Sequence, residues 1–288
     1  MPEGHTIHRY AREHRRWLRG RAVEVSSPQG RFAAGAGLLD GRTLLAVDPY
    51  GKHLFYRWEG GAILHVHLGL YGGFRIFGTV RGEQGPIRGE QEPIDAQQPY
   101  AEVPPPTPGT RLQLGTSEVT IRLAGPTTCE LLDPDGEARI RARLGPDPLR
   151  RDADGEAVAA ALRRRTTPIG AALLDQNVVA GIGNVFRAEA LFVCGIAPLR
   201  PANLLDRDDF DRLWTTIRSM LAEGLRRGKI VTVEPADVGR RSRGRLRADQ
   251  RHYVYRRAGL PCRRCATAVR AFELAARTAY ACPTCQPR

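Results

Sequence analysis

The feature that most constrains the fold of this chain is a set of four cysteines near its C-terminus. Cys262 and Cys265 form one C-x2-C pair, sixteen residues follow, and Cys282 and Cys285 form the second pair. Two such pairs joined by a hairpin can present four thiolates tetrahedrally to zinc, with no open position left for catalysis. The spacing therefore predicts a four-cysteine zinc ribbon that holds one structural Zn²⁺. A pair of disulfides is the alternative, and an intracellular location disfavours it.

Length and apolar patterning indicate such a location. The 288 residues suffice for two domains and a small metal module. No apolar run approaches the ~20 residues of a membrane span. The N-terminus contains Glu3 and an Arg/His-rich stretch where a signal peptide would be apolar. We therefore expect a cytoplasmic protein.

Positive charge is concentrated at the C-terminal end. The formal net charge is +13, and residues 240–288 contain 13 arginines but only two acidic residues. A GC-rich genome would enrich arginine along the whole chain, but it would not remove acidic residues from one segment. Forked guanidinium groups suit a polyphosphate, so this segment indicates a nucleic acid partner.

The chain changes character along its length and predicts an α+β protein. Apolar spacing predicts a helix over 4–19, and short alternating runs from 22 to about 122 predict a β-sandwich. Helical patterns follow from about 154. A tandem repeat at 81–94 and the Pro/Gln-rich stretch after it are expected to form a surface loop. We expect four parts: a sandwich domain at 1–125, a linker at 126–148, a helical domain at 149–233, and an Arg-rich loop with the zinc module at 234–288.

The first residues, Met1-Pro2-Glu3-Gly4, allow two interpretations. Pro-Glu is an ordinary helix start, and taken alone this is the simpler one. Removal of Met1 would instead expose a secondary amine, a nucleophile that is neutral for part of the time because α-amino groups titrate near ~8. Its attack on a sugar C1′ would give a cationic iminium, which acidifies C2′ and promotes β-elimination.

Four motifs in order resemble the bacterial formamidopyrimidine-DNA glycosylase/endonuclease VIII family. They are MPEG at the start, YGKHLF at 50–55, LLDQNVVAGIGN at 173–184, and the ribbon with Arg277 in its hairpin. The resemblance covers nearly the whole chain, and MPEGHT with HLGLYGG is most similar to the actinobacterial endonuclease VIII branch. It implies a monomeric, nucleoid-associated glycosylase/AP lyase of base excision repair. A helix–two-turn–helix domain and the zinc ribbon would then bind double-stranded DNA carrying a damaged base or an abasic site.

The resemblance also implies catalytic roles for four residues. Pro2 would form the Schiff base, and Glu3 would be the acid that opens the sugar ring. Lys52, in a Gly-Lys hairpin turn, would contact phosphate and assist β-elimination. Arg277, at the tip of a hairpin held by zinc, could bind a phosphate bidentately, and a solvated arginine is the alternative; the resemblance implies that it holds a phosphate and assists δ-elimination.

Further residues would contact DNA in a cationic cleft between the two domains. Leu70 and Tyr71 would fill the space of the flipped base, in an exposed turn flanked by Gly69, Gly72 and Gly73. Asn184, expected to cap a helix, would help to cradle a phosphate. Arg143 matches a DNA-contacting arginine of the endonuclease VIII type.

The sequence departs from the family pattern at Thr6, where a second glutamate is usual, and at Gly69, where a polar intercalating residue is known. His65 and His67 alternate on an expected strand, and a structural or phosphate-facing role is favoured over a metal site. The Leu70-Tyr71 turn resembles that of the endonuclease VIII branch, and this resemblance implies oxidised pyrimidines as substrates. Removal of 8-oxoguanine and formamidopyrimidines is the alternative activity, and a non-catalytic zinc-containing DNA-binding protein is the alternative class.

Overall fold

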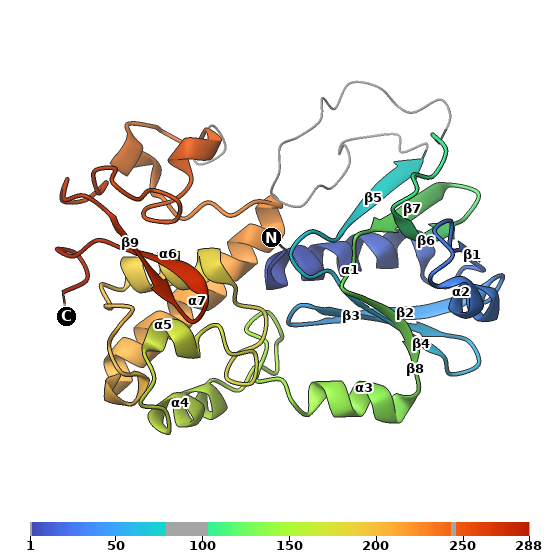
Figure 1. Cartoon of the computed structure of the whole chain (residues 1–288), viewed down its shortest axis with the longest axis horizontal. Helices are drawn as coiled ribbons and strands as arrows, with labels where there is room; N and C mark the ends of the chain where they lie inside the picture. Colours follow the sequence, from blue (N-terminus) through green and yellow to red (C-terminus); the bar gives the residue numbers. More distant parts are fainter. Residues whose placement is uncertain (1, 79–102, 243–245, 288) are drawn as a thin grey trace. The chain divides into compact units, whose positions relative to one another are not determined.

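The computed structural model describes residues 2–78, 103–242 and 246–287, and it divides the chain into two compact units, Met1–Ala142 and Arg143–Arg288 (Figure 1). The repeat at 81–94 lies outside the described residues. No helix in the described part of the chain is both long enough and apolar enough to cross a membrane.

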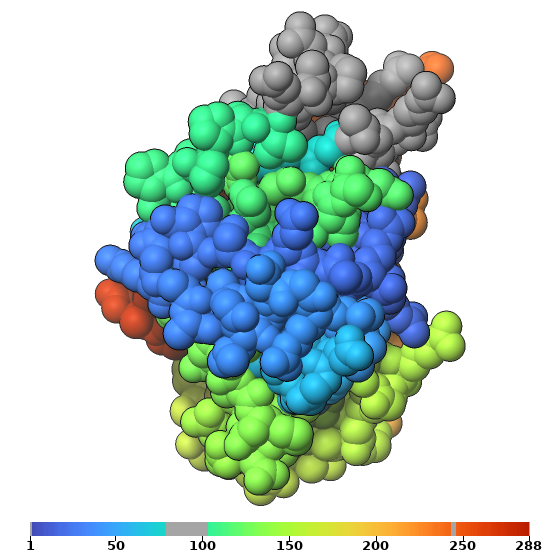
Figure 2. Space-filling view, turned by 90° about the vertical axis from the view of Figure 1, so that its right-hand side faces the viewer, coloured from blue at the N-terminus to red at the C-terminus, as the bar shows by residue number. Residues whose placement is uncertain are grey.

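The first unit is a β-sandwich of two antiparallel four-stranded sheets with strand orders β1-β6-β7-β5 and β2-β3-β4-β8. The strands of the first sheet are β1 (Glu24–Ser26), β5 (Gly73–Gly78), β6 (Thr110–Gly115) and β7 (Val119–Ala124). Those of the second are β2 (Leu44–Tyr50), β3 (His53–Trp58), β4 (Ile63–His67) and β8 (Thr128–Leu132). In Figure 2 the blue surface of the β1–α2 segment adjoins the green surface around β6, as the pairing of β1 with β6 requires. The expected sandwich is confirmed.

Helix α1 (Gly4–Leu18) packs against this sandwich through the face that its apolar spacing predicted. Tyr10 contacts the Phe74 ring edge-on, and the His14 Nδ1 atom lies 2.7 Å from the Tyr56 hydroxyl. The shorter helix α2 (Ala33–Leu39) packs beside β1. Because Tyr10 and His14 contact both sheets, they fix how the helix and the start of the chain lie on the unit.

The segment 126–148, where we expected a linker, contains ordered structure instead. Strand β8 pairs with β4 from His67↔Thr128 to Ile63↔Leu132. Helix α3 (Pro134–Arg141) begins with an Asp133 cap and proline in its first turn, which is a strong helix start. Its buried Glu137 accepts hydrogen bonds from Arg57 and Arg141, so α3 belongs to the first unit. The unit boundary falls at 142/143, after this helix.

The second unit is helical and ends in a hairpin. Its helices are α4 (Gly155–Arg163), α5 (Ile169–Ala172), α6 (Asn184–Val193) and α7 (Arg207–Arg227). Short 3-10 turns lie at η1 (Ala202–Leu204), η2 (Pro235–Val238) and η4 (Ala248–Gln250). Strands β9 (Arg270–Leu274) and β10 (Arg277–Ala281) form the hairpin, and β10 packs on α6. The central helix α6 is buried along almost its whole length, so it organises this unit.

Candidate active site

Pro2 and Glu3 lie at the start of α1, and both are buried. The Glu3 backbone carbonyl accepts hydrogen bonds from the Thr6 and Ile7 amides at 2.9 and 3.3 Å. The Glu3 side chain does not cap the helix. The backbone of Glu3 therefore begins the helix, while its carboxylate is directed elsewhere in a site where Glu3 is 0% exposed.

Lys52 occupies the tip of the β2–β3 hairpin, as the sequence predicted. Tyr50 pairs with His53, so Gly51 and Lys52 form a two-residue turn. Gly51 has φ +57°, and glycine at the first central position is the requirement of a type II′ turn. The turn holds the half-buried lysine at the end of the sheet.

Leu70 and Tyr71 lie in the turn between β4 and β5, and the Tyr71 ring is 91% exposed. The expected exposed turn is confirmed. It is closed by a hydrogen bond from the Gly72 amide to the Leu68 carbonyl at 3.0 Å. Tyr71 is therefore not a core residue. A large aromatic side chain that is almost fully exposed is typical of a contact surface.

The departure at Gly69 has a steric explanation. Gly69 has φ +65°, and a Cβ at this position would lie 1.9 Å from the Thr127 hydroxyl oxygen. A polar intercalating side chain therefore does not fit position 69 of this chain. At the other departure from the family pattern, Thr6 makes a local contact in place of a second glutamate. Its hydroxyl lies 3.2 Å from the His5 Nε2 atom in a buried position.

The N-terminus, the Lys52 turn and the Leu70–Tyr71 turn lie at the same end of the first unit (Figure 1). The register explains why the two turns share this end, because His53, the residue after Lys52, pairs with His67 at the end of β4. The start of α1 and the two turns that carry the site residues predicted in this unit thus lie at one end of it.

A histidine cluster beside Lys52 was only partly anticipated. His53 Nδ1 lies 2.8 Å from His65 Nε2, and His65 Nδ1 lies 2.9 Å from the Glu130 carboxylate. The His53 and His67 rings are 4.8 Å apart. The partners His53 and Glu130 are adjacent to His65 only through strand pairing, which periodicity cannot reveal.

Burial keeps this cluster uncharged. Burial, together with the smaller effects of the neighbouring histidines and of Lys52, lowers the pKa of His53 to about 3 and that of His67 to about 4. Burial also lowers the pKa of His65, against the opposing effect of Glu130. The rings beside Lys52 are therefore neutral at pH 7, so they add no positive charge to that of the lysine.

In the second unit, the four cysteines form a zinc site. Their Sγ atoms all lie within 4.8 Å of one another, with Cys262–Cys285 at 3.9 Å and Cys265–Cys282 at 3.4 Å. Zn–S bonds of about 2.3 Å give a tetrahedron edge of about 3.8 Å, which these separations match, whereas a disulfide needs about 2 Å. These thiols fit one structural zinc ion, and the disulfide alternative is wrong.

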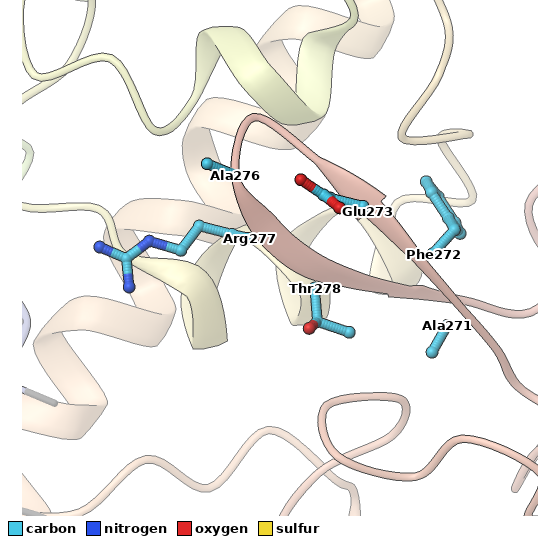
Figure 3. A pocket seen from close by; sticks show the side chains of 6 residues that line it. All are labelled: Ala271, Phe272, Glu273, Ala276, Arg277 and Thr278. Carbon is cyan, nitrogen blue, oxygen red and sulfur yellow. The ribbon is translucent and has the colours of Figure 1, made fainter.

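Arg277 is exposed at the tip of the β9–β10 hairpin, where the sequence placed it. Its side chain extends away from the hairpin (Figure 3). An open surface pocket on the hairpin is lined by Ala271, Phe272, Glu273, Ala276, Arg277 and Thr278. The zinc site at the hairpin's base makes this tip a rigid support for a cation.

Asn184 does not cap helix α6 as expected. Gly183 is the N-cap and Asn184 is the first helical residue. Its side chain is committed to the hairpin: Nδ2 donates to the Thr278 carbonyl at 3.0 Å, and Oδ1 accepts from Arg187. Asn184 thus contacts Thr278, which is the neighbour of Arg277 in the chain. Arg143 is exposed at the start of the second unit, just after α3.

A β-sandwich followed by a helical unit with a zinc-binding hairpin is the domain arrangement of a class of DNA glycosylases with AP lyase activity, and family models place the chain in this class. Three family models match the chain in order. They are the formamidopyrimidine-DNA glycosylase N-terminal domain at 1–134, the formamidopyrimidine-DNA glycosylase H2TH domain at 144–235, and a zinc finger found in FPG and IleRS at 259–288.

Relatives agree over the full length. The chain is 44% identical over 287 residues to endonuclease 8 1 of Mycobacterium tuberculosis, an alignment that covers 99% of this chain and 100% of that protein. It is 35% identical to probable endonuclease 8 2 of Streptomyces coelicolor, over 99% of this chain and 94% of that one. The chain therefore belongs to the formamidopyrimidine-DNA glycosylase/endonuclease VIII family, whose members act in base excision repair.

Solved structures share the fold. The MutM (Fpg) protein of Thermus thermophilus superposes with a TM-score of 0.73 at 31% identity, covering 99% of this chain and 98% of that one. The Fpg of Lactococcus lactis, solved in complex with abasic-site DNA, gives a TM-score of 0.75 at 20% identity, covering 99% of this chain and 100% of that one.

Proposed function

We propose that this enzyme removes oxidised pyrimidines from double-stranded DNA and cleaves the resulting site by β,δ-elimination, with Pro2 as the nucleophile. The observation that carries the proposal is the grouping of buried Pro2 and Glu3 with the Lys52 turn at one end of the first unit. A secondary amine, an acid and a cation at one edge form the minimum set for imine chemistry next to phosphate.

The proposed reaction begins after Met1 is removed. The Pro2 nitrogen attacks C1′ of the damaged nucleotide, and the bond from C1′ to the base breaks. The attacking amine loses its N–H proton, and the base leaves protonated, so the nitrogen regains its lone pair. The C1′–O4′ bond then opens, O4′ takes a proton from Glu3, and the nitrogen lone pair forms the C1′=N⁺ iminium. Its positive charge cannot be lost by deprotonation of nitrogen, because proline nitrogen carries no further proton.

The iminium then drives two eliminations. Loss of a C2′ proton and cleavage of the C3′–O bond release the 3′ phosphate, and Lys52 assists this β-elimination. Loss of the C4′ proton and cleavage of the C5′–O bond release the phosphate on the 5′ side, and Arg277 assists this δ-elimination. Cations suit both sites, because each leaving group is an anionic phosphate.

The proposed DNA contacts follow from exposure and charge. Leu70 and Tyr71, exposed at the β4–β5 turn, would replace the stacking lost when the damaged base leaves the helix. Arg143 and the N-terminus of α6, where Asn184 lies, would contact backbone phosphates. The likeness of this turn to the endonuclease VIII branch, together with the 44% identity to endonuclease 8 1, supports pyrimidine lesions over 8-oxoguanine and formamidopyrimidines.

Borohydride trapping tests the nucleophile. Protein shown by intact mass to lack Met1 is incubated with a thymine-glycol duplex and with an abasic duplex under reduction. The wild type and Pro28→Gly, which changes an exposed proline of the same unit, are expected to form a covalent adduct. Pro2→Gly leaves a primary α-amine, whose imine is not permanently cationic, and is expected to form much less adduct. An undiminished adduct in Pro2→Gly would assign the nucleophile to another amine, and binding without any adduct would support the non-catalytic class.

A lesion panel in the same assay tests the substrate class. Equal concentrations of duplexes with thymine glycol, 5-hydroxycytosine, 8-oxoguanine and a formamidopyrimidine are compared in single turnover. Faster adduct formation on the two pyrimidine lesions supports the proposal. Faster formation on the two purine lesions would establish the alternative activity instead.

A further inference from the structure

The hairpin tip that carries Arg277 has an unusual backbone. Leu274 pairs with Arg277, so Ala275 and Ala276 form a two-residue turn. Their φ angles are +54° and +53°. Consecutive left-handed residues are the mark of a type I′ turn, which Asn-Gly forms readily and alanine disfavours because its Cβ meets the following carbonyl. The turn therefore needs support from outside the hairpin.

That support comes from Arg187, a residue of α6 that is 1% exposed. Its Nη1 atom donates to the Leu274 carbonyl at 3.4 Å, and its Nη2 atom donates to the Thr278 carbonyl at 3.1 Å. The Leu274 carbonyl directly precedes the left-handed turn, and the Thr278 carbonyl directly follows Arg277. One planar guanidinium thus holds both ends of the segment, an arrangement that a point-charge ammonium cannot reproduce.

The guanidinium is itself fixed by its surroundings. Nη1 also donates to the Gly170 carbonyl at 3.3 Å, and Nη2 donates to Asn184 Oδ1. A Cβ at Gly170 would lie 2.8 Å from the Leu274 side chain, so the glycine allows the hairpin to approach closely. Arg187 therefore connects two fixed points of the helical unit to the hairpin.

We propose that Arg187 is a positioning residue for Arg277: it maintains the left-handed Ala275–Ala276 turn and so sets where the Arg277 side chain points. The proposal rests on the role of Arg277 in δ-elimination proposed above. It assigns control over one of the two strand-cleavage steps to a residue that is buried inside the second unit.

The test measures β- and δ-elimination products separately on a preformed abasic duplex. Arg187→Met is expected to lower the δ/β product ratio by about tenfold or more, since a displacement of about 1 Å in a catalytic group can cost that much or more. Borohydride trapping and bound zinc are expected to stay at wild-type levels. Arg226→Met, at an exposed arginine of α7 bonded to Glu223, is the matched control and keeps the wild-type ratio.

A rescue separates positioning from a general structural role. Ala275→Asn with Ala276→Gly supplies the residues that a type I′ turn favours. Added to Arg187→Met, this pair is expected to restore the δ/β ratio to within about threefold of the wild type. Arg187→Lys is expected to remain low, because it cannot hold both carbonyls. Failure of the rescue would overturn the positioning role.

A surface variant covers the case in which Arg187→Met does not fold. Ala276→Val places a β-branched residue at the exposed turn, where left-handed φ is most costly, and is expected to lower the δ/β ratio selectively. Arg277→Ala separates the role of Arg277 in δ-elimination from the positioning role of Arg187. If it leaves the ratio unchanged, its proposed role fails and the positioning role fails with it. If it lowers the ratio while Arg187→Met and Ala276→Val do not, only the positioning role fails.

Discussion

The Asn184 side chain donates a hydrogen bond to the Thr278 carbonyl at 3.0 Å, joining the first turn of α6 to the hairpin strand that begins at Arg277. The N-terminus of α6 is thereby held against Thr278, the residue next to Arg277. Helix N-termini and arginine side chains both bind phosphate in many proteins, so under the function proposed above this hydrogen bond would set the spacing of two phosphate contacts.

Asn184→Ala should destabilise the second unit and weaken DNA binding. The change removes the acceptor of a buried Arg187 N–H and one donor to Thr278, and an unsatisfied buried polar group costs about 1–3 kcal/mol. Urea denaturation measures the loss. Asn203→Ala, at an exposed residue of η1, serves as the control and should change stability by less than about 0.5 kcal/mol. Equal stability of the two variants would show that the Asn184 contact has no energetic importance.

Gly69→Ala should lower stability, because position 69 combines φ +65° with a distance of 1.9 Å between an added Cβ and Thr127 Oγ1. The left-handed conformation alone costs about 1–2 kcal/mol, and the steric contact adds to it. Gly37→Ala is the matched control, since nothing lies within 4 Å of a Cβ there and the residue is in helix α2. It should be neutral or stabilising by up to about 1 kcal/mol.

Thr127→Ala is expected to recover part of the loss caused by Gly69→Ala. It removes the hydroxyl at 1.9 Å but leaves the Cβ of residue 127, which would lie 3.2 Å from the Cβ of an alanine at position 69, and it leaves the backbone strain. Thermal unfolding of the two single variants and the double variant tests this coupling. Purely additive effects would mean that the backbone angle, and not Thr127, decides the identity of residue 69.

Most of the fold could be predicted from local sequence signals. The cysteine spacing, the alternating runs and the spacing of Ile7, Tyr10 and His14 each report structure within a short segment, and the structure confirms the ribbon, the sandwich and α1. We predicted a linker at 126–148, but this segment contains β8. That strand is stabilised by pairing with β4, which is distant in the sequence. Pairing of distant strands leaves no local periodicity.

In the candidate site, too, local sequence signals could be predicted and contacts between distant segments could not. Lys52 and Tyr71 were placed correctly because glycines mark their turns. The link between His65 and Glu130 depends on sheet register, and the clamp of Arg187 on Leu274 and Thr278 depends on how a hairpin packs on a helix. One signal for Arg187 was available: it follows Asn184 by three residues, which places both on one face of a helix.

Removal of zinc should abolish DNA binding while leaving the first unit folded. Cys262 and Cys282 belong to a small core with Phe192 and Tyr253, so loss of the metal frees the hairpin and opens that core. Chelation with a zinc-release dye, followed by limited proteolysis, should show cleavage after 246 and protection of residues 2–78. DNA binding retained at zero zinc content would show that the hairpin does not need the metal to function.

His14→Gln should flatten the dependence of stability on pH. Burial lowers the pKa of His14 to about 3, whereas an unfolded histidine titrates near 6.5. Between these values the unfolded state binds a proton that the folded state does not, so the free energy of unfolding decreases as pH falls. Below about pH 6 this histidine contributes up to about 1.4 kcal/mol per pH unit to that decrease.

Tyr56→Phe is the control that separates titration from hydrogen bonding. It removes the partner of His14 Nδ1 but leaves the histidine buried, and burial is the cause of the low pKa. Urea denaturation between about pH 7 and pH 4.5 should show Tyr56→Phe parallel to the wild type at lower stability. His14→Gln should give a shallower slope over the same range. If both variants ran parallel to the wild type, protonation of His14 would not contribute to acid destabilisation, and other histidines whose pKa burial lowers, such as His5 and His53, would account for it.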